Sequence, residues 1–191
     1  MRRTLRARLP GSTFEQTRLP CHVIASNVRN GREVVLSHGD LVEALMASAA
    51  VPVPLPIQST SRGELFDGGI ANNAPMSVAH SLGAHRIIVL PAGFPCATRR
   101  LPATAVAMLL HTFSLLVARQ LATDAWRLRD ACTLRVVPPL CPLRVVPYDL
   151  SQTASLMAQG ADHTRRRLAD GGMDRDEIPL TLMPHDHAGA P

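Results

Sequence analysis

The residues with the clearest capacity for chemistry are the carboxylate and the two glycines of Asp67-Gly68-Gly69. The apolar pair Leu65-Phe66 precedes them, and a segment rich in alanine and asparagine follows. This order predicts a strand that ends at Asp67, then a sharp turn, then the start of a helix. A carboxylate fixed at the end of a strand is well placed to act as a general base or to orient one. Asp-Gly and Gly-Gly dipeptides also mark ordinary turns, so a purely structural turn is the alternative interpretation.

The residues after Asp67 predict how the turn is built. Glycines permit a positive φ and a close approach of two backbone segments. Asn72 or Asn73 is the predicted N-cap of the next helix, with Pro75 in its first turn. We expect this helix to span Pro75–Leu82 and to end at Gly83.

The chain before this segment predicts two strands within otherwise irregular structure. Met1–Thr17 shows no periodicity and is expected to be irregular. β-prone runs predict strands over Cys21–Ala25 and Arg32–Leu36, joined by a turn. The polar stretch Gln58–Gly63 is expected to be a loop that leads into the strand ending at Asp67.

An apolar stripe at helical spacing predicts a helix over Leu41–Ala50, capped by Ser37 or Asp40. Ser48 lies within this helix, and its position in the stripe makes it a tempting nucleophile. A nucleophilic serine needs small neighbours and a strained strand-to-helix turn, so that its hydroxyl projects freely. We therefore do not assign Ser48 as a nucleophile, and expect its hydroxyl to bond to backbone.

The second half of the chain predicts further strands and long helices. Arg86–Leu90 is a continuous apolar run, of the kind buried on both faces of an α/β sheet. The apolar stretch Ala103–Ala118 is shorter than the roughly twenty residues of a membrane span, so a buried or half-buried helix is favoured. The remaining expected elements are short strands at Leu134–Val137 and Leu143–Val146, and a last helix from Ser151 or Thr153 to Ala169.

Composition favours a globular domain and argues against nucleic-acid binding. The 191 residues are 46% hydrophobic and 3% aromatic, and their formal net charge is +5. All 20 basic residues are arginine, and a basic surface attracts anionic phospholipid headgroups. Nucleic-acid binding favours a clustered basic patch with aromatic residues for stacking. Only Arg165-Arg166-Arg167 clusters, and a solvated helix face explains it, so we predict no nucleic-acid partner.

Cysteine and histidine positions predict neither disulfides nor a metal site. The four cysteines form no C-x-x-C pair, which favours free thiols in a reducing, cytoplasmic compartment. They are Cys21, Cys96, Cys132 and Cys141. His185 and His187 lie in a tail that we expect to be disordered beyond Asp174, so we assign no metal and no cofactor.

The motifs around Asp67 occur in an order that resembles the patatin-like phospholipase family of serine acyl hydrolases. The sequence A-S-A-A-V-P within Leu41–Pro52 is followed by V-P-L-P, by D-G-G-I-A-N-N-A-P, and by G-A-H-R-I-I-V-L-P. The resemblance runs from about Leu19 to about Leu168 and implies a three-layer α/β fold. Ser26-Asn27 matches a polar pair of the family loosely. Val53 departs from the pattern, because the family usually has glycine there.

The resemblance implies a lipid acyl hydrolase that works through a serine–aspartate dyad. Asp67 would be the dyad carboxylate, with Gly68 and Gly69 shaping the turn that holds it. The sequence contains no G-x-S-x-G nucleophile elbow and no run of three glycines for an oxyanion loop. It therefore looks like the C-terminal part of such a domain, truncated at its N-terminal side, with Met1 falling inside the domain.

These features lead to a set of expectations for the whole chain. We expect an irregular segment at 1–18, the C-terminal part of a patatin-like domain at 19–172, and a disordered tail at 173–191. The expected substrate is a phospholipid or another acyl ester, with the missing N-terminal half supplied by another chain as one option. Peripheral association with a membrane is the alternative to a purely cytoplasmic location. A non-catalytic fragment or pseudoenzyme that acts as a binding or assembly module is the alternative function.

Overall fold

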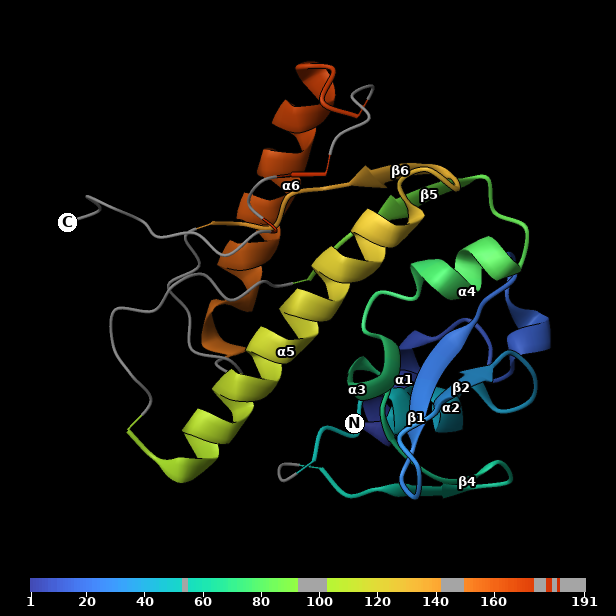
Figure 1. Ribbon diagram of the computed structural model, residues 1–191. Helices are drawn as coiled ribbons and strands as arrows, with labels where there is room; N and C mark the ends of the chain where they lie inside the picture. The colour runs from blue at the N-terminus through green and yellow to red at the C-terminus, as the bar shows by residue number, and fades with distance from the viewer. Residues whose placement is uncertain (53–54, 93–102, 142–149, 174–177, 180–181, 183–191) are drawn as a thin grey trace. The chain divides into compact units, whose positions relative to one another are not determined.

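The computed structural model describes residues 1–52, 55–92, 103–141, 150–173, 178–179 and 182 (Figure 1). The chain divides into two compact units, Met1–Pro75 and Met76–Pro191. We call them unit 1 and unit 2. Both combine strands with helices, so the mixed α/β class predicted from the sequence is confirmed.

Unit 1 contains a four-stranded antiparallel sheet in the order β2-β1-β4-β3. Its strands are β1 (Val23–Asn27), β2 (Glu33–Leu36), β3 (Gln58–Thr60) and β4 (Gly63–Asp67). Figure 1 shows β1 between β2 and β4. The first four residues of β1 are buried without alternation, so both faces of this central strand are covered.

The loop predicted at Gln58–Gly63 is wrong in part, because β3 pairs with β4 as a hairpin. Ser59 is exposed on this edge strand, which explains why its polar sequence gave no strand signal. The hairpin turn is closed by Thr60, whose hydroxyl donates to the Gly63 carbonyl at 2.9 Å. Gly63 has a φ of 102°, which glycine adopts without strain.

The helices of unit 1 include two that sequence patterning missed. Helix α1 (Arg2–Arg8) and the 3-10 helix η1 (Phe14–Gln16) lie in the segment predicted to be irregular. Helix α1 buries none of its residues, so it has no apolar periodicity to detect. The short η1 is fixed by a capping box between Thr13 and Gln16, and it places Phe14 in the core beside Val23 and Leu41.

Helix α2 (Leu41–Ser48) confirms the predicted helix and decides between its two candidate caps. The Oδ1 atom of Asp40 accepts a hydrogen bond from the Glu43 N–H at 2.8 Å, so Asp40 is the N-cap. The buried stripe of α2 covers the sheet and supplies much of the core of unit 1. Its members are Leu41, Val42, Ala44 and Ala47.

Unit 2 begins with α4 (Met76–Ser81), which ends before Gly83 at a φ of 90°, as predicted. Strand β5 (Arg86–Val89) pairs in parallel with β6 (Thr133–Val136). The prediction that this first strand is buried on both faces is wrong. Ile87 and Val89 are buried, whereas Ile88 is 56% exposed.

Helix α5 (Ala105–Leu128) connects these two strands and extends beyond the apolar stretch that predicted it. It spans 24 residues, because the helix continues past Ala118 through arginine, glutamine and aspartate. Only 11% of its most apolar window is buried, so of the two predicted options a fully buried helix is wrong, and the buried residues on one face of its C-terminal half agree with a half-buried helix. By length and composition alone, α5 is able to cross a membrane.

Helix α6 (Thr153–Ala169) follows the 3-10 helix η2 (Leu150–Gln152) and ends where predicted. Its N-cap position is Gln152, without a side-chain cap, so the prediction of a Ser151 or Thr153 cap is wrong. The predicted strand at 143–146, Cys96, and the histidines at 185 and 187 lie outside the described residues. So does most of the segment after 173, for which we predicted disorder.

Candidate functional site

Asp67 ends β4, as the sequence predicts, and the backbone around it is anchored on two sides. It pairs with Ala25 of the central strand β1. Its own N–H donates to the Ala50 carbonyl at 3.1 Å, and the Gly68 N–H donates to the Ser48 carbonyl at 3.2 Å. The end of this strand is therefore fixed against both β1 and the C-terminal end of α2.

Gly68 is required for space rather than for an unusual backbone conformation. Its φ is −66°, and Gly69 is also absent from the glycines with positive φ, so neither residue uses the positive φ that glycine permits. The close backbone approach that glycine permits does occur at Gly68. A Cβ atom at Gly68 would lie 2.1 Å from the Ile24 carbonyl oxygen of β1. Any side chain at this position would push α3 (Gly69–Asn72) away from the sheet.

Gly69 acts directly on the carboxylate. Its N–H donates to Oδ1 of Asp67 at 2.7 Å. A Cβ atom at Gly69 would lie 2.8 Å from the same oxygen and 3.0 Å from Oδ1 of Asn73. The absence of a side chain therefore lets the carboxylate fold back onto the backbone of the turn.

Asp67 is half-buried, and its burial raises the pKa of the carboxyl group above the ordinary value of 3.8. The hydrogen bond from Gly69 acts in the opposite direction, because it stabilises the charged form. Burial is the larger of the two effects, so this carboxylate accepts a proton more readily than an exposed aspartate does. Among the described residues, no serine hydroxyl donates to this carboxylate.

Ser26 positions the site, and sequence inspection missed this role. Its side chain is fully buried in β1. The hydroxyl donates to the backbone carbonyl of Asp67 at 2.8 Å and accepts from the Ala71 N–H at 3.0 Å. One buried hydroxyl thus joins the end of β4 to the first turn of α3. The sequence signal was a serine directly after the three buried strand residues Val23–Ala25.

The two asparagines after the turn do not cap the next helix, so that prediction is wrong. Asn72 is the last residue of α3, and Asn73 is its C-cap. Asn72 is 6% exposed, and its side-chain amide donates to the Glu33 carboxylate of β2. The residue therefore ties α3 to the sheet.

Ser48 is the last residue of α2, which confirms its placement in a helix. Its backbone carbonyl, at 3.2 Å from the Gly68 nitrogen, is the group that reaches the Asp67 turn. A helix end of this kind does not present a hydroxyl as a strand-to-helix elbow does.

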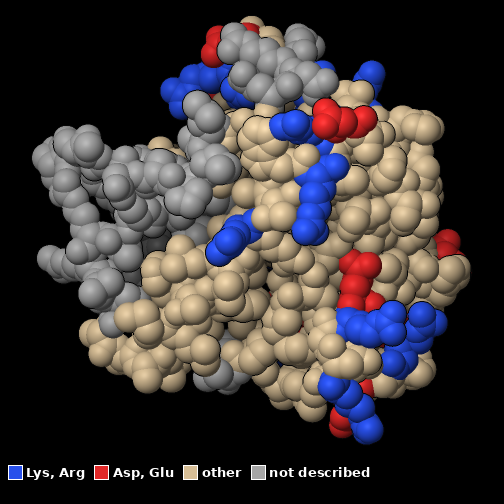
Figure 2. Space-filling view, in the orientation of Figure 1, with Lys and Arg blue, Asp and Glu red and all other residues tan. Residues whose placement is uncertain are grey.

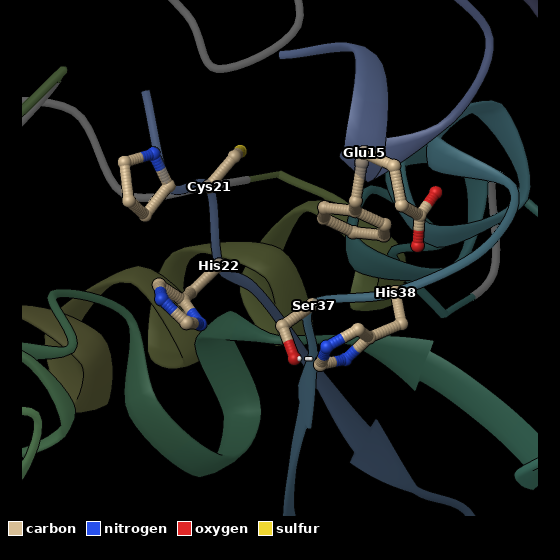
Figure 3. A pocket seen from close by; sticks show the side chains of 7 residues that line it. Glu15, Cys21, His22, Ser37 and His38 are labelled. Carbon is tan, nitrogen blue, oxygen red and sulfur yellow. Dashed lines mark hydrogen bonds between the residues drawn. The ribbon is translucent and has the colours of Figure 1, made fainter. Parts of the chain in front are cut away.

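A small open pocket of about 250 Å³ lies at the start of β1 and the end of β2 (Figure 3). In the antiparallel sheet this is also the edge at which β4 ends, although Asp67 does not line the pocket. The Ser37 hydroxyl lies 2.9 Å from Nδ1 of His38. The Gly39 N–H donates to Glu15 and holds the pKa of that carboxyl below its usual value. Sequence inspection did not identify this cluster.

Metal ligation has no support in the part of the chain that the structure describes. No group of three or more His, Cys, Asp or Glu side chains there is placed to hold an ion. Cys21, Cys132 and Cys141 form no disulfide among these residues.

A comparison with known families gives one match to this region. The family model for patatin-like phospholipase matches residues 1–80. The matched range contains all of unit 1, including the Asp67 turn, and extends into α4.

Proposed function

Residues 1–80 of this chain belong to the patatin-like phospholipase family, and from that premise we propose that Asp67 is the carboxylate of a serine–aspartate dyad. The substrate class is lipid acyl esters, on which this family acts. The proposal depends chiefly on one observation. The carboxylate at the end of β4 is half-buried and is held by the Gly69 N–H at 2.7 Å.

In the proposed reaction the carboxylate takes the proton of a serine hydroxyl as the serine oxygen attacks the ester carbonyl. Collapse of the oxyanion expels the alcohol and leaves an acyl-serine, which water then hydrolyses. A raised pKa suits Asp67 to this role, because a general base is most effective when its pKa lies near the working pH. Gly69 orients Oδ1, so Oδ2 is the oxygen that accepts the proton.

The nucleophile is the part that this sequence does not supply, since it contains no G-x-S-x-G elbow. We propose that the serine and the oxyanion loop come from a further segment or from another chain, which would complete a three-layer domain. Residues 19–172 are the proposed contribution of this chain to that domain. A cytoplasmic location is part of this proposal, because the four cysteines of the sequence form no C-x-x-C pair.

The second candidate function is a non-catalytic binding or assembly module. The lack of a G-x-S-x-G elbow in this sequence favours it, because a carboxylate without its serine cannot carry out acyl transfer. The two functions separate in a hydrolysis assay.

The test measures p-nitrophenyl butyrate hydrolysis by the chain alone, and by the chain fused behind a family segment that carries the glycine loop and G-x-S-x-G. The chain alone should show no turnover above background, and the fusion should be active. Asp67→Asn should then lower kcat about a hundred- to ten-thousand-fold, because asparagine cannot accept the proton. Asp40→Asn is the matched control, since it makes the same change in unit 1 and asparagine remains a good N-cap.

Gly69→Ala and Ser48→Ala sharpen the assignment. The new methyl group of Gly69→Ala would meet Oδ1 of Asp67 at 2.8 Å, so it should lower kcat while leaving the unit folded. Ser48→Ala should leave the activity within a few-fold. Loss of turnover in folded Ser48→Ala, or full activity in Asp67→Asn, would contradict the proposal. An inactive but folded fusion would favour the non-catalytic module.

A further inference from the structure

The N-terminal half of α5 exposes an unusual amount of apolar surface. Four large apolar side chains lie within about 120° of one another around this half of the helix, at 3.6 residues per turn, and each is between 40% and 62% exposed. They are Met108, Leu109, Leu115 and Leu116. Exposed apolar residues are ordinary when scattered, but a contiguous patch on one helix face marks an interaction surface.

The C-terminal half of the same helix has a different character. Its inner face is buried through Ala118, Leu121, Ala122 and Ala125. Its outer face carries exposed Arg119 and Arg127, together with Trp126 at 45% exposure. The guanidinium of Arg129, just after the helix, lies 4.6 Å from the centre of the Trp126 ring.

The outer face therefore changes along its length from apolar to cationic and aromatic. In Figure 2 the surface over the N-terminal part of α5, at the lower left, is uncharged, and blue basic side chains lie beyond it. Two carboxylates accompany the arginines. Asp124 lies 3.7 Å from Arg127, and Asp130 lies 3.2 Å from Arg129.

The helix is poorly suited to cross a bilayer despite its length. The part without Arg, Asp or Glu, Ala105–Ala118, is about 21 Å long at 1.5 Å per residue. A hydrocarbon core is about 30 Å thick. The buried alanines and leucine of the second half also hold that half within unit 2. An apolar tip followed by arginine and tryptophan instead has the pattern of a helix that enters one leaflet.

We propose that this face of α5 binds the surface of an anionic lipid bilayer. Leu109 and Leu116 enter the acyl region, and Arg119 and Arg127 contact the headgroups. Charge complementarity selects this occupant, because the whole chain carries a formal net charge of +5 and three arginines, Arg119, Arg127 and Arg129, accompany two carboxylates at this end of the helix. The inference extends the proposed function to the place where a lipid substrate is met, but its test requires no catalysis.

The sole tryptophan of the chain is Trp126, so unmodified protein reports on the contact. With vesicles of phosphatidylglycerol and phosphatidylcholine, Trp126 emission should shift to shorter wavelength, and brominated lipid should quench it. Phosphatidylcholine vesicles should give weaker binding, and added salt should weaken binding to the anionic vesicles. An unchanged Trp126 spectrum at high anionic lipid would overturn the proposal.

Vesicle sedimentation of variants then locates the surface. Leu109→Glu/Leu116→Glu should weaken binding about a hundredfold or more, because two apolar anchors become anionic. Arg119→Gln should cost about fivefold, and only on anionic vesicles. Leu19→Glu/Leu82→Glu is the matched control, since these leucines are 77% and 57% exposed elsewhere on the chain, and it should bind like the parent.

Two outcomes would overturn the assignment of the surface. Equal loss in the control pair would show that added negative charge alone explains the effect. A dimer in light scattering that Leu109→Glu/Leu116→Glu converts to a monomer would show that a second copy covers the face. Vesicle binding without hydrolysis by any fused form would leave this inference standing while the proposed catalytic function failed.

Discussion

The two units of this chain use apolar residues in opposite ways. In unit 1 the central strand β1 is buried on both faces and α2 buries four of its residues against the sheet. In unit 2 the helix α6 buries none of its residues, and α5 buries only its C-terminal half. Apolar area removed from water stabilises a fold by about 25 cal/mol per Å². Unit 1 therefore has a conventional core, whereas the described helices of unit 2 leave several large apolar side chains exposed.

Polar groups follow the same division. In unit 1 the buried Ser26 hydroxyl and the Asp67 carboxylate have specific backbone partners at 2.7–3.0 Å. In unit 2 the ion pair of α6 between Arg166 and Asp162 lies on exposed surface. Exposed pairs of this kind contribute at most about 1 kcal/mol. Precise geometry for chemistry is thus concentrated in unit 1, and adaptable surface in unit 2.

The largest predicted effect on stability is that of Gly68→Ala. Its Cβ would lie 2.1 Å from the Ile24 carbonyl oxygen, a contact that only backbone movement relieves. We expect a loss of about 3–5 kcal/mol in the free energy of unfolding, measured by urea denaturation.

The matched control is Gly160→Ala within α6 of unit 2, where no described atom lies within 4 Å of a new Cβ. This change should instead stabilise the helix by about 0.5–1 kcal/mol, because alanine is the better helix former. Equal effects of the two substitutions would contradict the contrast between a packed unit 1 and an open unit 2.

A smaller effect is predicted for Ser26→Ala. The substitution leaves the Ala71 N–H without its acceptor and the Asp67 carbonyl without its donor in a buried place. We expect a loss of about 2–3 kcal/mol in the free energy of unfolding. Ser59→Ala is the control, since Ser59 is exposed on β3 of the same sheet, and it should change little. A negligible cost for Ser26→Ala would mean that water replaces the hydroxyl and that α3 is not tied to β4 through it.

Local signals made part of this fold predictable from sequence. The N-cap Asp40 and the strand ending at Asp67 depend on neighbours within a few residues, and both are confirmed. The glycine that ends α4 is likewise a local signal, because a positive φ at Gly83 needs no distant partner.

The remainder depends on partners far away in the chain. Strand β3 exists because β4 pairs with it, and the two bonds of Ser26 reach 41 and 45 residues along the sequence. Gly68 also looked like a conformational glycine, whereas its requirement is set by Ile24 on another strand. The exposure of α5 could not be inferred either, because an apolar helix has the same sequence pattern whether it is covered or not.

The smallest predicted effect is the pH dependence of stability at Asp67. Burial raises the pKa of this carboxyl group above 3.8, so the folded chain binds the proton more tightly than the unfolded chain does. The folded state is then favoured most below pH 3.8, and this advantage is lost as the pH rises through the raised pKa. Asp67→Asn is neutral at every pH and keeps an oxygen for the Gly69 N–H. The variant should therefore melt at a higher temperature than the parent near neutral pH, and the difference should vanish in acid.

Glu15→Gln provides the opposite sign within the same unit. The Gly39 N–H lowers the pKa of Glu15 below 4.5, so its stabilisation is present above pH 4.5 and is lost as the pH falls through the lowered pKa. Glu15→Gln should consequently melt below the parent at neutral pH, with the difference shrinking in acid. Melting temperatures of the three proteins across acidic to neutral pH test both signs at once. Asp67→Asn could also melt below the parent at neutral pH. That result would mean that groups besides Gly69 stabilise the charged carboxylate and lower its pKa, and a carboxylate with a lowered pKa would be a poor acceptor for a serine proton.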